Sequence, residues 1–197
     1  MLLLCGIVLH RAPAAAQPTP IEAQGDYAHP ASGMIMPLTV GAFRRVGVYR
    51  YDAEALDVSA NYHLDAPAGR VLASIYAYPM PGGGLADPAA RRDACVREFA
   101  LRQRELTSVR AGATLLAERD AAPPKGYESV PGHAAAYTFQ AMIGGVPRTL
   151  HSELHVFCFV GRSWIIKYRF TGPDSPDTRQ AIAAFVAALP WTVRPPR

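Results

Sequence analysis

The stretch from residue 150 to residue 170 constrains the fold more than any other part of the chain. Two runs rich in β-branched and aromatic residues flank the short turn Gly161-Arg162-Ser163, a pattern typical of a β-hairpin. Alternation along the first run predicts two apolar faces, one with Val156, Cys158 and Val160 and the other with Phe157 and Phe159. A strand that is apolar on both faces has to be covered on both, so we expect this hairpin at the centre of a sheet.

Shorter strand patterns precede this hairpin, and two helical patterns accompany them. The strand candidates are residues 43–51, 56–64, 71–78, 114–119, 133–142, 148–160 and 164–170. A helix is predicted from Pro88 to about Val109, and a second helix follows Ser175 and ends at Pro190. We therefore predict an α+β fold, with an antiparallel sheet of about six to seven strands, a long central helix and a C-terminal helix packed on the sheet.

The chain of 197 residues is long enough for one domain with a substantial core. An apolar run, Leu2–Leu9, followed by Ala14-Ala15-Ala16 is typical of an export signal, so residues 1–16 are a predicted signal peptide. Residues 17–33 are polar and aperiodic, which predicts a disordered lead-in. We expect residues 34–191 to form a single domain and residues 192–197 to form a tail. We expect a periplasmic or secreted protein without a transmembrane anchor in the mature chain, because the apolar run is too short to span a bilayer.

Cleavage after Ala16 would remove Cys5 and leave Cys95 and Cys158. Two cysteines in an exported chain form an even set, and an oxidising compartment favours a disulfide between them. Cys95 lies on the apolar stripe of the long helix and Cys158 on an apolar face of the hairpin, so the two meet if that helix covers that face. The alternative is a pair of buried, unpaired thiols that pack as small hydrophobic groups.

The formal charge of +4 comes almost wholly from arginines that are spread along the chain. Dispersed arginine does not form the basic patch that nucleic-acid binding requires, so we expect no nucleic-acid partner. No Gly-x-Ser-x-Gly elbow, Walker loop or Cys-x-x-Cys pair occurs in the sequence. We therefore assign no catalytic residue and expect no cofactor.

Residues 151–155, His-Ser-Glu-Leu-His, form the sharpest constellation of chemically active side chains. On a strand His151, Glu153 and His155 share one face, and imidazole and carboxylate groups are suitable ligands for first-row metals. The alternative is the solvent-facing half of a strand whose other half is buried. The tyrosines of the first strands are mostly expected to pack the sheet, but they also suit a contact surface for a partner. These are Tyr49, Tyr51, Tyr76 and Tyr78.

The order of elements resembles the PsbP-like fold of extrinsic photosystem proteins and their exported bacterial relatives. It is also similar to a set of uncharacterised exported proteobacterial proteins. The resemblance covers residues 34–190 and is carried by residues 41–45 (Gly-Ala-Phe-Arg-Arg), 75–79 (Ile-Tyr-Ala-Tyr-Pro) and 161–170. It implies a fold and transfers no catalytic residue.

These observations predict an exported protein that is a non-enzymatic binding module for a protein or a small ligand. The alternative is a metal-binding or metal-dependent protein that uses His151, Glu153 and His155.

Overall fold

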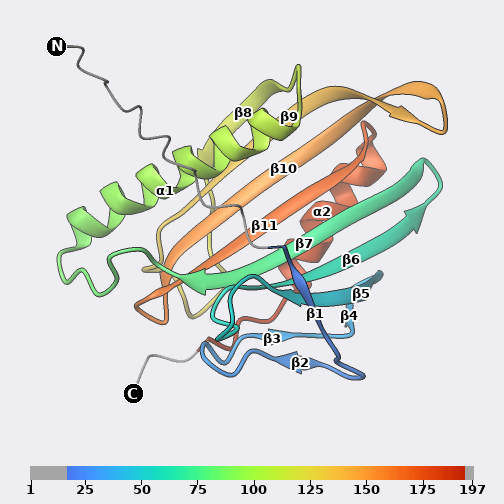
Figure 1. Ribbon diagram of the computed structural model, residues 1–197. Helices are drawn as coiled ribbons and strands as arrows, with labels where there is room; N and C mark the ends of the chain where they lie inside the picture. The colour runs from blue at the N-terminus through green and yellow to red at the C-terminus, as the bar shows by residue number, and fades with distance from the viewer. Residues whose placement is uncertain (1–16, 194–197) are drawn as a thin grey trace, which may run out of the picture.

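The computed structural model describes residues 17–193, and within them the chain is mostly β-structure (Figure 1). The strands are β1 (Thr19–Ile21), β2 (Tyr27–Ala28), β3 (Ile35–Met36), β4 (Thr39–Val40), β5 (Phe43–Arg50), β6 (Val58–Ala66), β7 (Gly69–Pro79), β8 (Thr114–Asp120), β9 (Gly132–Ile143), β10 (Val146–Val160) and β11 (Trp164–Pro173). The helices are α1 (Pro88–Val109) and α2 (Pro176–Ala188). β2 and β3 form a two-stranded sheet, and the other strands form one antiparallel sheet of nine strands.

The large sheet consists of two meanders joined at one seam. Its order is β1-β5-β6-β7-β11-β10-β9-β8, with β4 paired to β5. β5, β6 and β7 follow one another in sequence and in space, and so do β8, β9, β10 and β11. The pairing of β7 with β11 is the seam between them. The β10–β11 hairpin thus lies inside the sheet, where its apolar faces predict it to be.

The two helices cover opposite faces of this sheet (Figure 1). We call these the α1 face and the α2 face. The core of the α1 face comprises Tyr78, Met80, Ala94, Cys95, Phe99, Leu106, Ala135, Tyr137, Leu154, Val156, Cys158, Phe159 and Ile165. The α2 face holds a larger cluster with most of the buried aromatic rings, among them Phe43, Tyr62, Phe157, Tyr168, Phe170, Phe185 and Trp191.

A β-bulge changes the predicted facing of the end of β10. The register between β10 and β11 shifts between Phe157 and Val160, and Phe159 has a φ of 60°. Phe159 therefore packs on the α1 face beside Cys158, while Val160 packs on the α2 face with Phe157. The prediction that Val160 shares a face with Cys158 is wrong, because strict alternation does not survive a bulge.

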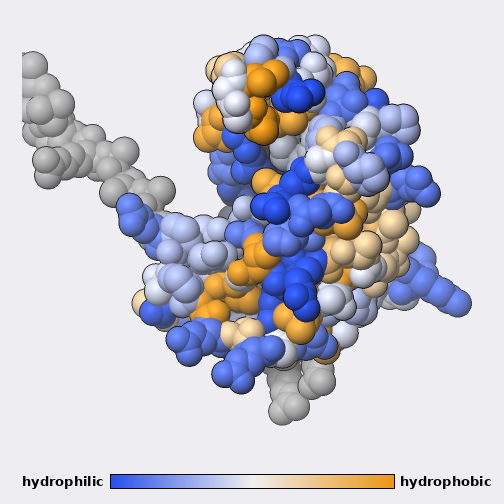
Figure 2. Space-filling model, turned by 90° about the vertical axis from the view of Figure 1, so that its right-hand side faces the viewer, coloured by the Kyte–Doolittle hydropathy of each residue, from blue (hydrophilic) through white to orange (hydrophobic). Residues whose placement is uncertain are grey.

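Residues 139–149 of the β9–β10 hairpin extend beyond the strands on either side. β8 pairs with β9 only as far as Thr138, and β11 pairs with β10 only from Leu150 onward. Figure 2 looks onto this end of the molecule, and hydrophobic residues lie at its top among strongly hydrophilic ones. The outer part of this hairpin is thus exposed on both of its faces.

The predicted fold class, an α+β fold of about six to seven strands with a long central helix, is wrong. The large sheet has nine strands, a small sheet adds two more, and the chain is mostly β. The α1 pattern has its predicted bounds, but the helix lies across one face and not at the centre. The strands that sequence patterning missed, β1 to β4, are two or three residues long, too short for alternation to reveal.

The segment 17–33 is ordered in the structure, which corrects the prediction of a disordered lead-in. Buried Arg45 donates hydrogen bonds to the backbone carbonyls of Ala23, Gly25 and Met36. Buried His29 bonds the Ser32 hydroxyl. Polar side chains that look solvated in the sequence thus hold this segment against the sheet through hydrogen bonds.

At the other end of the chain, the predicted tail is partly packed. Val193 is buried, and the Thr192 hydroxyl donates to the carbonyl of Gly33. The predicted signal peptide, residues 1–16, and the rest of the tail, residues 194–197, lie outside the described residues.

Candidate functional site

His151, Glu153 and His155 lie in a row on β10, and all three side chains project from the α2 face. Glu153 bridges the two histidines: its Oε1 is 3.0 Å from Nε2 of His151, and its Oε2 is 2.8 Å from Nε2 of His155. Burial raises the pKa of Glu153, but the hydrogen bonds and charges of the two histidines outweigh burial and lower that pKa to about 2. The carboxylate is therefore ionised at neutral pH and accepts a hydrogen bond at each oxygen.

The row is buried, contrary to the alternative that it is a solvent-facing half of a strand. His151 is 3% exposed and His155 is 4% exposed. The ring of His155 packs edge-on against Phe170, with centroids 5.8 Å apart. Nδ1 of His151 is buried and has no hydrogen-bond partner within the described part of the chain.

The structure thus brings the three side chains together, with the Glu153 carboxylate hydrogen-bonded between the two histidines. We call this arrangement the clamped carboxylate. Among residues 17–193, no group of three or more His, Cys, Asp or Glu side chains is arranged to hold a metal ion. Both Nε2 atoms point at the Glu153 carboxylate, so the atoms that would coordinate a metal are already engaged with one another.

Two adjoining hollows open over this row, between α2 and strands β8 and β9. We call them together the α2 cleft. The smaller, of about 240 Å³, reaches His151, and the larger, of about 320 Å³, reaches His155. Both are lined by Glu153, by Arg119 of β8 and by Arg179 of α2. The carboxylate and the two guanidinium groups therefore lie where the hollows meet.

The rest of the cleft is apolar and made of small side chains. Alanines of β9 and Leu116 line the smaller hollow. The wall of the larger hollow is one flank of α2, where Ala183 and Ala187 are exposed, Val186 is half-buried and Ile182 is buried. Small side chains leave the cleft open, whereas larger ones at the same positions would fill it.

The two arginines differ in how they are held. The guanidinium of Arg179 donates to the Ser175 carbonyl at 2.9 Å and forms a 3.0 Å ion pair with Asp174, so its position is fixed. Arg119 is exposed, and its side chain forms no hydrogen bond or ion pair with any residue from 17 to 193. Since the two histidines already satisfy Glu153, Arg119 is a cation that remains available to a ligand.

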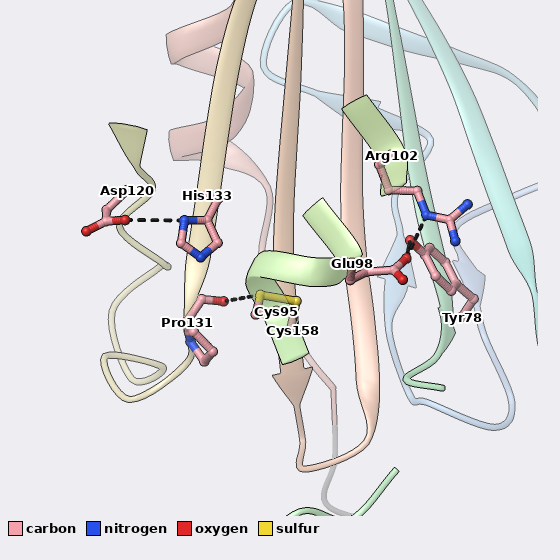
Figure 3. The surroundings of a disulfide bond; sticks show 8 residues. All are labelled: Tyr78, Cys95, Glu98, Arg102, Asp120, Pro131, His133 and Cys158. Carbon is pink, nitrogen blue, oxygen red and sulfur yellow. Dashed lines mark hydrogen bonds and ion pairs between the residues drawn. A yellow bond between two sulfur atoms is a disulfide. The ribbon is translucent and has the colours of Figure 1, made fainter. Parts of the chain in front are cut away.

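On the opposite face, the structure joins Cys95 of α1 to Cys158 of β10 in a disulfide, with Cα atoms 5.6 Å apart (Figure 3). Beside it, Tyr78 donates a hydrogen bond of 2.9 Å to Glu98, which also pairs with Arg102 at 2.6 Å. Burial and the Glu98 charge raise the pKa of Tyr78. Glu98 thus accepts from both Tyr78 and Arg102.

The four candidate tyrosines lie on or beside the α1 face. Tyr78 is buried, and the other three are half-buried. Nζ of buried Lys167 lies 4.0 Å from the centroid of the Tyr76 ring and 5.4 Å from that of Tyr78. Two of the tyrosines thus enclose a lysine, a contact that the sequence did not predict. The contact surface itself stays a prediction for Tyr49, Tyr51 and Tyr76.

Sequence reasoning missed the two arginines that complete the cleft. Arg119 and Arg179 are about sixty residues apart, a separation at which no local motif can connect them. The available signal was the alanine-rich composition of β9 and of α2, which predicts a sheet face and a helix that meet without filling the space between them.

No protein-family model matches the chain, and no curated protein matches it. Among solved structures, it is similar to the crystal structure of LpqN, described as involved in cell envelope biogenesis of Mycobacterium tuberculosis. That match has 16% identity and a TM-score of 0.38 and covers 91% of each chain. A likeness at this level carries no inference about this chain, and the PsbP-like resemblance stays a prediction. Among the described residues, neither helix has the length and apolarity needed to cross a membrane.

Proposed function

We propose that the protein is an exported, non-enzymatic module that binds a small ligand in the α2 cleft, and that the ligand carries a carboxylate or phosphate on an aliphatic body. The observation that carries the proposal is the meeting of the two hollows at Arg119, Glu153 and Arg179. Ligand sites are concave and mostly apolar, with a few converging polar groups that fix orientation.

The anionic group of the ligand is assigned to the arginines. Arg179 is held in place by Asp174, and Arg119 is free to close over the ligand from the other side of the cleft. Guanidinium groups bind carboxylates and phosphates through paired hydrogen bonds, which gives both affinity and orientation. The aliphatic body packs against the flank of α2 that lines the larger hollow.

The clamped carboxylate supports a binding role over a catalytic one. A general base needs a free oxygen within reach of the proton it removes. Both oxygens of Glu153 are engaged by histidines, so the row serves as a rigid floor for the cleft. Nδ1 of His151 is buried and has no hydrogen-bond partner in residues 17–193.

Export is supported by the disulfide, which persists in oxidising compartments and is rare in the cytoplasm. Together with the predicted signal peptide, it supports a location in the periplasm or outside the cell. N-terminal sequencing of the mature protein should begin near Gln17, and an uncleaved cytoplasmic chain would contradict this part of the proposal.

The cleft is tested by titrating the protein with octanoate and with octyl phosphate, and following amide shifts by NMR. We expect shifts concentrated on β9 and α2, and a loss of affinity of about tenfold in the Arg119→Gln/Arg179→Gln double variant. The matched control is Arg44→Gln/Arg97→Gln, which removes two exposed arginines outside the cleft. Equal loss in both double variants, or shifts elsewhere on the protein, would contradict the proposal.

A further inference from the structure

The outer part of the β9–β10 hairpin carries large hydrophobic side chains that are about half exposed or more. Met142 is 65% exposed, Ile143 55% and Val146 48%. They surround the turn Gly144-Gly145, where both glycines have positive φ and open space around them. We call residues 141–147 the hairpin tip. Such residues are costly in water, and in soluble proteins a projecting apolar group marks an interaction site.

The tip is apolar on both of its faces. Ile143 pairs with Val146 across the hairpin, and the next pair, Met142 with Pro147, points the opposite way. A groove on a partner protein would cover one face of a hairpin and leave the other in water. An apolar phase that surrounds the tip would cover both, and a bilayer is such a phase.

The charges behind the tip suit the surface of a phospholipid bilayer. Residues 139–149 contain no acidic residue, and their one charged side chain is Arg148. Arg148 is exposed and forms no ion pair among the described residues. It lies two positions behind Val146, about 7 Å along the strand, which is the depth of the headgroups when the tip reaches the acyl chains.

A groove of about 600 Å³ continues from the tip toward the body of the protein. It is lined by apolar Leu72, Ile143 and Leu150 and by Arg70 and Arg148. Leu72 is 51% exposed, so the apolar surface extends from the hairpin onto β7. Arg70 is already paired with Asp65, which leaves Arg148 as the cation that faces a lipid phosphate.

From these observations we propose that the hairpin tip inserts into the surface of a phospholipid bilayer, with Arg148 at the level of the lipid phosphates. None of residues 141–147 lines the α2 cleft, so this contact is distinct from ligand binding there. It holds the domain at a membrane surface through one hairpin.

The test is flotation of the full chain with vesicles of dioleoyl phosphatidylcholine, with and without a quarter of dioleoyl phosphatidylglycerol. We expect Ile143→Ser/Val146→Ser to lower the partition coefficient about tenfold on both kinds of vesicle. The matched control is Val46→Ser/Val96→Ser, which removes two valines of similar exposure, 54% and 51%, outside the tip. Since residues 1–16 are the same in all variants, the difference between the two double variants reports the tip alone.

Two further variants locate the contact. Arg148→Gln should lower the partition coefficient about fivefold on anionic vesicles and change it little on neutral ones. Ile143→Trp should show a fluorescence that brominated lipid quenches. Equal flotation of the tip and control variants, or no quenching of the introduced tryptophan, would overturn the proposal. Concentration-dependent self-association without vesicle binding would overturn it in favour of a second copy of the chain.

Discussion

The two faces of the sheet are held to their helices in different ways. On the α2 face, Phe185 of the short helix packs among aromatic rings. The centroid of its ring lies 5.0 Å from that of Phe43, 5.4 Å from that of Tyr62 and 5.4 Å from that of Phe170. On the α1 face the helix is longer, and a disulfide links it to β10. The long helix is thus attached by a covalent bond as well as by packing, whereas the short helix is held by its packing against the aromatic rings.

The two helices bury a similar share of their residues, five of 22 on α1 and three of 13 on α2, so the cross-link is what distinguishes their attachment. On α1 the buried residues are Ala94, Cys95, Glu98, Phe99 and Leu106, while Val96 and Val109 are 51% and 61% exposed. The cross-link adds stability without further apolar area, because it restricts the unfolded chain.

The largest expected effect comes from cutting that cross-link. The Cys95→Ala/Cys158→Ala variant should lose about 4 kcal/mol of unfolding free energy, since the bond closes a loop with a sequence separation of 63 residues. Urea denaturation of the variant and of the oxidised wild type measures the loss. A loss below about 1 kcal/mol would mean that α1 is held by packing after all.

The carboxylate on the α2 face should make stability fall in acid. The pKa of Glu153 is about 2 in the folded protein, against an ordinary value of 4.5. The folded state therefore binds fewer protons than the unfolded state between these values, and stability is lost as the pH falls from 4.5 toward 2. We expect Glu153→Gln to lose about 2 kcal/mol at pH 7 and to differ little from wild type near pH 2. Thermal unfolding across this range, with exposed Glu54→Gln as control, measures the effect.

The lysine on the α1 face should have a smaller effect, and at neutral pH its buried charge lowers stability whereas the Glu153 carboxylate raises it. Burial, assisted by the charges of Arg102 and Arg169, lowers the pKa of Lys167 to about 8, although Glu105 and Asp57 act to raise it. The folded state then binds fewer protons than the unfolded state from about pH 8 to 10.5, so stability rises with pH in that window. At pH 7 burial of the charged amine lowers the stability of the folded state, and its contact with the Tyr76 ring offsets only part of that loss.

Lys167→Met should accordingly raise the unfolding free energy at pH 7 by about 1 kcal/mol and abolish the rise between pH 8 and 10.5. Lys125→Met, which removes the other lysine of the chain from an exposed loop, is the matched control. A destabilised Lys167→Met variant would show that the contacts with the tyrosines outweigh the burial of charge.

Much of the sheet could be predicted from the sequence, because long apolar runs fix their own strands. The β10–β11 hairpin and the bounds of α1 follow from local patterns. The bulge at Phe159 does not, since a positive φ at a phenylalanine has no sequence signal. β1 to β4 depend on buried Arg45 and His29, polar residues whose partners lie far away in the sequence.

Only part of the candidate site could be predicted, because the rest depends on contacts between residues far apart in the sequence. The spacing of His151, Glu153 and His155 gives their common face, and the structure keeps it. Their burial, and the approach of Arg119 and Arg179, depend on where α2 and β8 lie against the sheet. No local sequence pattern predicts where α2 and β8 lie against the sheet.

The seam between β7 and β11 makes the chain divisible. A cut in the exposed segment between Met80 and α1 would separate β1–β7 from α1, β8–β11 and α2, and both disulfide cysteines would stay in the second piece. Each piece alone would present an unpaired edge strand of ten or eleven residues, the surface on which proteins aggregate. Mixed together, the pieces can satisfy each other's edge, and Phe185 can bury itself between rings from both. The fold therefore contains a ready pair of complementary fragments, and all the residues that line the α2 cleft lie in the second of them.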